Sequence, residues 1–212
     1  MDCCHCQGAE KFFDEKTAKR DLRNYLKKGP SGATQLLLEA LKAQGVKDLT
    51  LLDVGGGVGV IQHELLRAGA SGGAAVDASA AYLEAARGEA RRQGLEERVS
   101  YTYGDFVELA PDVAEADIVT LDRVICCYPH MKELVGLSAG RARKFYGVIY
   151  PRDTWWTRVA FAIGNLYLRL SRSVFRIYIH STDAVDDVVR ANGLKPHYQQ
   201  NKGLWQVVLY VR

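Results

Sequence analysis

The sequence predicts an α/β fold in which helices cover both faces of a mostly parallel sheet. Three observations lead to this prediction. Between residues 49 and 150, short apolar segments alternate with longer helix-like segments, a pattern typical of strand–helix repeats. The apolar segments lack the in–out alternation of half-exposed strands, which indicates strands buried on both faces. The last two expected strands follow one another directly, which adds an antiparallel hairpin.

Length and composition are those of one soluble globular domain. The chain has 212 residues, of which 48% are hydrophobic and 25% charged, enough to bury a sizeable core. The formal net charge of +3 is too small by itself to indicate a nucleic-acid partner. No N-terminal segment has the charged start, apolar centre and cleavage site of a signal peptide, so we expect a cytoplasmic protein.

Two helices are expected before the first strand. Phe12–Lys28 carries apolar side chains at helical spacing and ends at Gly29-Pro30, and a second helix extends over Ser31–Gln44. We expect residues 1–47 to form an N-terminal tail and a helical lid. Residues 48–212 then form the main domain.

Five strands and two helices are expected in alternation after the lid. The expected strands are Leu49–Val54, Gly73–Val76, Val99–Tyr103, Asp117–Leu121 and Phe145–Tyr150, and the helices are Val60–Ala68 and Ala80–Gln93.

The C-terminal part changes character. A helix over Thr182–Ala191 is expected to stop at Asn192-Gly193. Two strands, Lys195–Gln200 and Trp205–Val211, then form a hairpin around the turn-forming residues 201–203. The expected sheet therefore has seven strands.

The most informative segment follows the first expected strand. Asp53–Gly59 is a strand end that turns into a helix through glycines, where a ligand can approach bare backbone. The spacing excludes the G-x-G-x-x-G dinucleotide fingerprint, since the third glycine would fall at Val60 or Gln62. The Lys and Ser/Thr of a phosphate-binding P-loop are also missing. The remaining pattern, Asp-x-Gly-x-Gly-x-Gly, resembles motif I of the class I S-adenosylmethionine-dependent methyltransferases.

This resemblance covers about residues 48–212 and implies a fold, an activity and a cofactor. The fold would be a Rossmann-like seven-stranded methyltransferase sheet, with the seventh strand inserted antiparallel beside the fifth. The cofactor would be S-adenosyl-L-methionine, with S-adenosyl-L-homocysteine as product, held at the carboxyl ends of the first strands. Residues 48–212 would be the catalytic domain.

The resemblance also implies roles for single residues. Asp53 would act on the amino-acid end of the cofactor, directly or through water, and Asp77 on the ribose hydroxyls. Asp105 would face the adenine amine. The alternatives are an N-cap for Asp77 and a turn aspartate for Asp105. The expected cofactor-binding residues are Tyr25, Asp53, Gly55, Gly57, Gly59, Asp77, Ala78, Asp105, Phe106, Leu121, Asp122 and Arg123.

Aromatic side chains of the lid are expected to close over the cofactor. Phe12, Phe13 and Tyr25 would exclude water from the sulfonium, which attracts aromatic faces. The alternative for each of them is ordinary core packing.

The segment after the fourth strand bears on the methyl acceptor. Residues 121–129, with Tyr178-Ile179-His180, resemble the magnesium-protoporphyrin IX methyltransferases, which esterify a porphyrin propionate. In those enzymes a His precedes a Tyr-Pro pair, and Cys127 occupies that position here. We expect a small-molecule acceptor with a carboxylate or hydroxyl on a large aromatic or tetrapyrrole-like compound. The candidate catalytic residues are Tyr128, His130 and His180.

Residues 151–180 are the expected acceptor-binding insertion. Six aromatic residues alternate there with five arginines, among them Arg158 and Arg169. Aromatic surface and bidentate arginines would suit a large, flat, acidic substrate. They would also suit peripheral membrane contact through residues 154–176, or an amphipathic helix that covers the sheet edge. The most apolar window, Trp155–Leu170, is too short to span a bilayer.

Other functions fit parts of the sequence. Cys3-Cys4-His5-Cys6 offers zinc-type donors without a second pair nearby, so we expect an oxidisable tail and no metal site. A non-catalytic S-adenosylmethionine-binding protein and a thiol or metalloid methyltransferase are the alternatives. No nucleic-acid partner is expected, because residues 127–130 lack the Pro-Pro-Tyr/Phe type of motif. The oligomeric state is left open.

Overall fold

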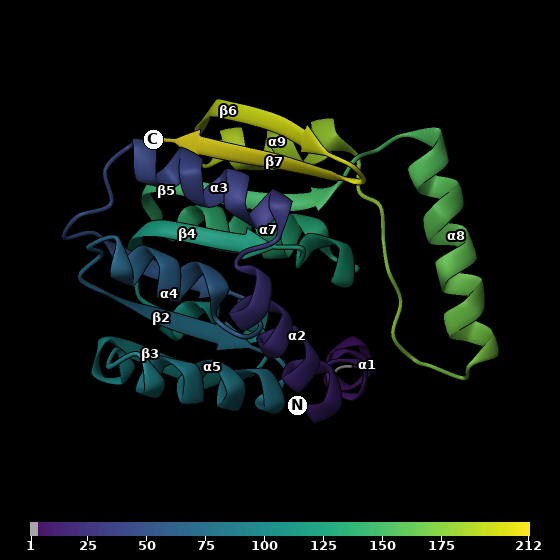
Figure 1. Ribbon diagram of the computed structural model, residues 1–212. Coiled ribbons are helices and arrows are strands. Elements are labelled where there is room, and N and C mark those ends of the chain that lie inside the picture. The colour runs from purple at the N-terminus through teal and green to yellow at the C-terminus, as the bar shows by residue number, and fades with distance from the viewer. Residues whose placement is uncertain (1–3) are drawn as a thin grey trace.

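A seven-stranded sheet forms the centre of the fold in the described part of the chain, residues 4–212 of the computed structural model. The strand order is β3-β2-β1-β4-β5-β7-β6 (Figure 1). Strands β1 to β5 are parallel, β7 is antiparallel beside β5, and β6 pairs with β7. The predicted fold class is confirmed. The strands are β1 (Thr50–Val54), β2 (Gly72–Asp77), β3 (Val99–Tyr103), β4 (Ala116–Asp122), β5 (Ala142–Pro151), β6 (Lys195–Lys202) and β7 (Trp205–Val211).

Helices cover both faces of this sheet. Side chains of α3, α4 and α5 pack on one face, and those of α6, α7 and α9 pack on the other. The helices are α1 (Cys4–Phe12), α2 (Glu15–Lys28), α3 (Gly32–Ala43), α4 (Val60–Arg67), α5 (Ala80–Arg92), α6 (Phe106–Leu109), α7 (Met131–Gly140), α8 (Trp155–Leu170) and α9 (Thr182–Ala191). Short 3₁₀ turns lie at Glu96–Arg98, Ala110–Asp112 and Ile125–Cys127. Among the described residues no helix is long and apolar enough to cross a membrane.

The N-terminal helical segment is divided in two. The helix predicted over Phe12–Lys28 begins three residues later, at Glu15, because the carboxylate of Asp14 accepts the backbone N–H of Thr17 and caps it; Phe12 instead ends a separate helix, α1. Apolar spacing continues across this break, so periodicity alone did not reveal it. Helix α7 was not predicted, and its two glycines, Gly136 and Gly140, weaken the sequence signal for a helix.

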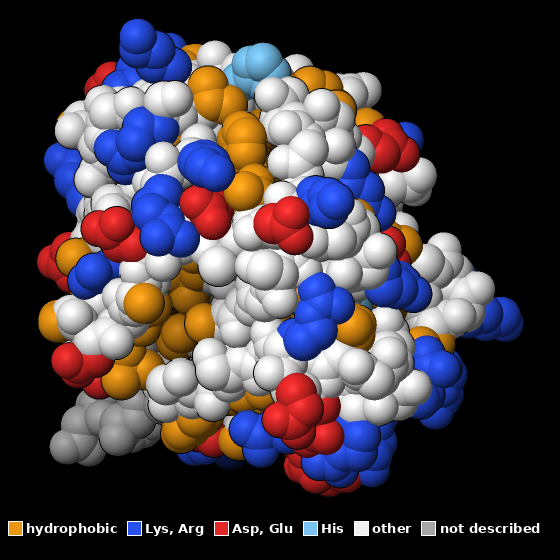
Figure 2. Space-filling view, turned by 90° about the vertical axis from the view of Figure 1, so that its left-hand side faces the viewer, with side chains coloured by type: hydrophobic (Ala, Val, Ile, Leu, Met, Phe, Trp, Pro, Cys, Tyr) orange, Lys and Arg blue, Asp and Glu red, His pale blue; other side chains and the backbone are white. Residues whose placement is uncertain are grey.

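The strand order reverses between β1 and β4, which places a crevice at their carboxyl ends. The loops that follow β1, β2, β3 and β4 begin at this edge of the sheet. The N-terminal helices α1 and α2 lie beside it (Figure 1). On the face seen from the left-hand side of Figure 1, away from α8, Lys and Arg side chains are interspersed with Asp and Glu (Figure 2). A site for a ligand is therefore expected at the carboxyl edge.

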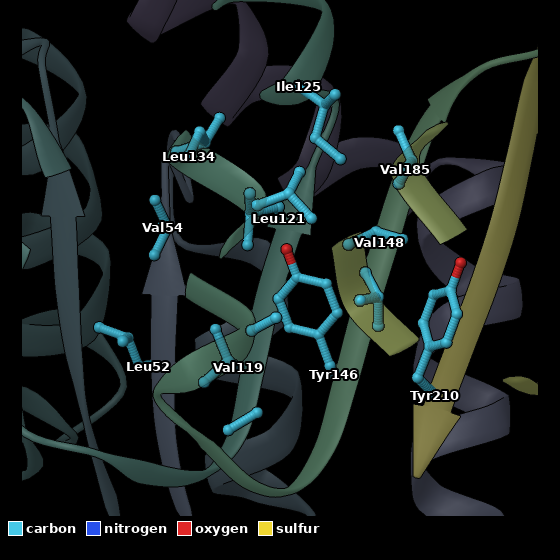
Figure 3. Packing of buried hydrophobic residues seen from close by; sticks show 14 of the residues in the cluster. Leu52, Val54, Val119, Leu121, Ile125, Leu134, Tyr146, Val148, Val185 and Tyr210 are labelled. Atoms are coloured by element: carbon cyan, nitrogen blue, oxygen red, sulfur yellow. The ribbon is translucent and has the colours of Figure 1, made fainter. Parts of the chain in front are cut away.

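Both faces of the central strands are buried, as the apolar runs predicted. Neighbouring residues of β1 point to opposite faces, so that Leu51 packs with α3 and α4, and Leu52 packs with α7. Figure 3 shows the cluster of buried side chains that contains Leu52, in which Tyr146 lies between the sheet and the helices. Its hydroxyl is 2.8 Å from that of Ser138 on α7, which satisfies both buried groups.

Candidate functional site

The glycine turn between β1 and α4 has the backbone that its sequence demands. Gly57 and Gly59 have φ angles of 58° and 78°, a region that favours glycine. A Cβ at Gly59 would lie 2.4 Å from Nε2 of Gln62, whereas a Cβ at Gly57 would meet only Tyr82, at 4.0 Å. Gly59 is therefore required by the turn itself, and Gly57 leaves open space beside the backbone.

Asp53 lies one residue before the end of β1, with its side chain wholly buried under the glycine turn. One carboxylate oxygen, Oδ1, accepts the hydroxyl hydrogen of Thr120 at 2.7 Å. The other oxygen, Oδ2, has no hydrogen-bond partner among the described residues. Burial raises the pKa of Asp53 to about 7, and the nearby Asp122 and Asp77 add to this effect. An unsatisfied carboxylate oxygen at this position is a candidate contact for a donor on a ligand.

Asp77 ends β2 and is held by two backbone amides. Its carboxylate accepts the N–H of Gly57 at 3.1 Å and the N–H of Ser79 at 2.8 Å. The N-cap of α5 is Ser79, so the alternative of Asp77 as N-cap does not hold. Burial raises the pKa of Asp77 to about 6, despite the two amides that lower it. The side chain is thus oriented without using its full hydrogen-bonding capacity.

Asp105 combines a local and a long-range role. Its Oδ1 accepts the N–H of Val107 at 2.9 Å and caps α6, as a turn aspartate would. Its Oδ2 accepts the hydroxyl hydrogen of Tyr128 at 2.9 Å. Burial and the carboxylate of Asp105 raise the pKa of Tyr128 above its usual value. The next residue, Phe106, is buried and lies in the same wall.

A polar network joins the end of β4 to α3. The guanidinium of Arg123 donates to both oxygens of Asp122, at 2.7 and 3.0 Å, and to the hydroxyl of Thr34 at 3.0 Å. Thr34 in turn donates to Asp122 at 2.6 Å. Arg123 has a φ of 61°, an unusual conformation for a non-glycine residue that turns the chain away from β4. The network therefore fixes this turn and connects it to the lid.

These residues surround one large cavity. Its volume is about 1070 Å³, and its wall runs from the glycine turn, past the ends of β2, β3 and β4, to α8. The lid lines it through residues of α1 and α2 and the loop before α3. The described lining residues with charge are Asp21, Asp53, Asp77, Asp105, Asp122, Lys28 and Arg123.

Aromatic rings close the side of the cavity that faces the lid. Phe12 of α1 stacks on Phe175 with ring centres 4.4 Å apart, and Phe13 meets the edge of Phe175 at 5.4 Å. Phe13 also packs on Tyr82 at 5.4 Å. The backbone carbonyl of Phe13 accepts the hydroxyl hydrogen of Ser79 at 2.7 Å. The lid is thus attached both to the loop after α8 and to the start of α5.

The geometry of the crevice agrees with a comparison against protein families. A family model for methyltransferase domains matches residues 46–171, which is more than half of the chain. This chain belongs to that methyltransferase domain family. A search of the curated proteins found no match.

Solved structures share the fold of this methyltransferase at low sequence identity. The magnesium protoporphyrin IX methyltransferase of Synechocystis PCC 6803 with bound SAH is 16% identical, with a TM-score of 0.75, and the match covers 98% of this chain and 99% of that chain. An O-methyltransferase family protein from Burkholderia thailandensis is 20% identical, with a TM-score of 0.71, over 94% of this chain and 60% of that chain. An O-methyltransferase family 2 protein from Planctomyces limnophilus in complex with apigenin is 17% identical, with a TM-score of 0.68, over 93% and 61%.

The methyltransferase brings most of the predicted site residues to the cavity. Those that line it are Tyr25, Asp53, Gly55, Gly57, Asp77, Ala78, Asp105, Phe106, Asp122, Arg123 and Tyr128. Tyr25 uses its hydroxyl elsewhere, since Arg67 donates to it at 3.0 Å and it lies 3.2 Å from Glu64.

Four predicted residues lie outside the cavity lining. Gly59 caps α4, and Leu121 points into the core because its neighbour Asp122 takes the cavity side of β4. His130 is exposed at the start of α7. His180 places Nε2 2.9 Å from the carbonyl oxygen of Tyr128, so this nitrogen carries the proton. Burial lowers the pKa of His180, which therefore holds the turn as a neutral donor.

The arginines of residues 151–180, the expected acceptor-binding insertion, do not surround the cavity as a site for an acidic substrate would require. Arg158 pairs with Asp153 at 2.7 Å, and Arg176 donates to backbone carbonyls of its own loop. None of the five arginines at 152–176 lines the cavity; the described cations there are Lys28 and Arg123. Arg123 and its partner Thr34 were recognisable only in part, because their contact spans 89 residues.

Cysteines occur at the cavity and in the N-terminal segment. Cys127 lines the cavity, with its sulfur 3.9 Å from that of Cys126. The predicted cluster Cys3-Cys4-His5-Cys6 lies outside the described side chains. Among the described residues no group of three or more His, Cys, Asp or Glu side chains is arranged to hold a metal ion.

Proposed function

We propose that this methyltransferase transfers the methyl group of S-adenosyl-L-methionine to a carboxylate or hydroxyl of a large, flat, mostly apolar small molecule. The observation that carries the proposal is the cavity that runs from the glycine turn to the aromatic rings of the lid and α8. Its volume of about 1070 Å³ is at the upper end of ligand pockets, which leaves room for a cofactor and a large acceptor.

The residues at the glycine turn fit the cofactor. Oδ2 of Asp53, which has no partner among the described residues, offers a buried acceptor for a cationic donor. The open backbone at Gly57 allows close approach. Asp77 offers an oriented carboxylate for vicinal hydroxyls. Carboxylates outnumber cations in the lining, so the field inside the cavity favours a positively charged ligand. When bound, S-adenosyl-L-methionine supplies a methyl group activated by its sulfonium.

The other part of the cavity fits a flat apolar acceptor. Phe12, Phe161 and Phe175 line it together with aliphatic side chains of α8 and the following loop. One of the similar structures is a magnesium protoporphyrin IX methyltransferase, and another was solved with apigenin. Protoporphyrin and apigenin are both flat aromatic compounds. Lys28 and Arg123 are the lining cations that would receive an acidic group of the acceptor.

A carboxylate is the favoured acceptor group because it needs no base. Tyr128 donates its hydroxyl hydrogen to Asp105 and has a raised pKa, so it acts as a hydrogen-bond donor. His180 donates to the backbone, outside the cavity lining. The protein then contributes by positioning the acceptor and by excluding water behind the buried ring of Phe175.

Product formation tests this proposal. The purified chain is incubated with S-adenosyl-L-methionine and a panel of porphyrins, aromatic carboxylic acids, phenols, thiols and arsenite, and products are identified by mass spectrometry. The expected product is a methyl ester or ether of a flat aromatic compound. Cofactor binding without transfer to any acceptor would favour the non-catalytic alternative, and methylation of thiols or arsenite alone would contradict the acceptor class.

A further inference from the structure

Helix α8 lies at one edge of the molecule (Figure 1). Most of its apolar side chains are exposed to solvent. Of its 16 residues only Thr157 and Leu168 are buried. The exposed fraction is 78% for Trp155, 64% for Ile163 and 76% for Leu170. Single exposed apolar residues are common on proteins, but a contiguous set of this kind marks an interaction surface.

These side chains form one face, which we call the outer face of α8. Its members recur every three or four residues, the spacing of one side of a helix: Trp155, Val159, Ile163, Leu166 and Leu170. The opposite side of α8 carries Phe161, Gly164 and Leu168, which line the cavity. The helix is therefore apolar on two sides, and only the inner side has a described partner.

Cations predominate around the outer face, where Arg158 pairs with Asp153, the residue before the N-cap of α8. Residues 154–182 contain four arginines and no Asp or Glu. Arg158 and Arg169 are three helical turns apart, so they lie on the same flank of the outer face. Arg172 follows the C-cap of the helix, Ser171. This flank contrasts with the face of Figure 2, where both signs are interspersed.

We propose that the outer face of α8 binds the surface of an anionic lipid bilayer, with the arginines toward the headgroups. An apolar face beside a cationic flank is the pattern of helices that lie in the membrane interface. Trp155, Trp156 and Tyr167 are of the residue types that favour the headgroup region. A symmetric contact between two copies would instead bring like-charged flanks together.

Vesicle co-sedimentation of the full chain tests the proposal. We expect binding to vesicles of phosphatidylcholine with phosphatidylglycerol, weaker binding to phosphatidylcholine alone, and release from the anionic vesicles as salt rises. The double variant Ile163→Glu/Leu170→Glu should reduce the fraction bound roughly tenfold or more, because two side chains leave the apolar phase. Leu26→Glu, on the exposed surface of α2, is the matched control and should bind as the wild type does.

The outcomes separate a lipid surface from a second copy and from misfolding. Absence of wild-type binding to anionic vesicles, or equal binding of the double variant, would overturn the proposal. So would a stable wild-type dimer in light scattering that the same two substitutions dissociate. Circular dichroism and S-adenosylhomocysteine binding by the double variant, both without vesicles, confirm that it is folded. The proposal concerns the outer face alone and does not depend on the proposed acceptor.

Discussion

The hydroxyl of Tyr128 donates to Oδ2 of Asp105 across 2.9 Å, and this bond joins the turn after β4 to the turn after β3. The other oxygen of Asp105 caps α6, so the carboxylate is held from two sides. Tyr128, which the sequence suggested as a candidate catalytic residue, thus orients an acid of the cavity wall. The pair predicts a binding role for Tyr128.

Tyr128→Phe should weaken the binding of S-adenosylhomocysteine and leave the chemical step nearly unchanged. Loss of one hydrogen bond to a carboxylate is worth about 1–2 kcal/mol, or roughly five- to thirtyfold in Kd. Calorimetric titration and kcat at saturating substrate measure the two quantities. Tyr198→Phe on β6, whose hydroxyl bonds Gln200 at the surface, is the control. A large fall in kcat at unchanged affinity would show instead that the Tyr128 hydroxyl is catalytic.

Asp77→Ala should weaken S-adenosylhomocysteine binding by roughly 1–3 kcal/mol, the range for an unpaired hydrogen-bonded site. The backbone amides of Gly57 and Ser79 also lose their acceptor, so a loss of stability is expected as well. Ser181→Ala removes the cap of α9, outside the cavity lining, and serves as a destabilised control with normal affinity. Wild-type affinity of Asp77→Ala, measured below the unfolding transition, would refute the ribose role.

Asp53 should make the ligand-free protein less stable as the pH rises. Its pKa is about 7 in the folded state and 3.8 when unperturbed, so between these values the unfolded chain ionises while the folded chain keeps the proton. The associated loss of unfolding free energy is complete above about pH 7 and on the order of 4 kcal/mol.

Asp53→Asn removes this contribution and provides the measurement. The difference in unfolding free energy, wild type minus variant, should fall between pH 4 and pH 8, and other ionisable groups cancel from it. The variant should also bind S-adenosylhomocysteine more weakly at pH 8, since an acceptor for a cationic donor is lost. A difference that stays constant across this range would mean that Asp53 titrates normally.

The sequence predicted the framework of the fold because that framework rests on local signals. Apolar runs, glycine stops and turn residues marked the seven strands to within a few residues, as β3 and β7 show. The break at Asp14 and helix α7 were missed, since a cap inside an apolar repeat and a glycine-containing helix give weak signals. Packing against the sheet decides helix α7, and the capping hydrogen bond of Asp14 decides the break.

The candidate site was predictable only where residues follow strands. Asp53, Asp77 and Asp105 each lie within two residues of the carboxyl end of a strand, so topology alone brings them to one cavity. The direction of a side chain was harder to predict: Leu121 and Asp122 are neighbours, and only the second lines the cavity. Thr34 reaches Asp122 over 88 residues, a contact that no local pattern contains.

Arg123→Gln should raise the KM of an acidic acceptor about tenfold while kcat changes less, because one charge-assisted hydrogen bond is lost. A parallel assay with a neutral acceptor should show no such increase. Arg169→Gln is the matched control: it removes an exposed cation of α8 that lies outside the cavity lining. Equal KM values for all three proteins would exclude Arg123 as the receiver of the acidic group.

Phe175→Ala should detach the lid from the loop after α8. The ring is 3% exposed, stacks on Phe12 and meets the edge of Phe13, so its loss removes contacts that hold α1. We expect a destabilisation of roughly 3 kcal/mol, faster proteolysis within the N-terminal helices and weaker S-adenosylhomocysteine binding. Phe175→Leu keeps much of the apolar volume, so its stability and ligand affinity should lie between those of the wild type and Phe175→Ala. Val174→Ala, on the exposed side of the same loop, should behave as the wild type. If Phe175→Ala lowers stability but leaves both proteolysis of the lid and ligand affinity unchanged, the aromatic stack serves packing alone.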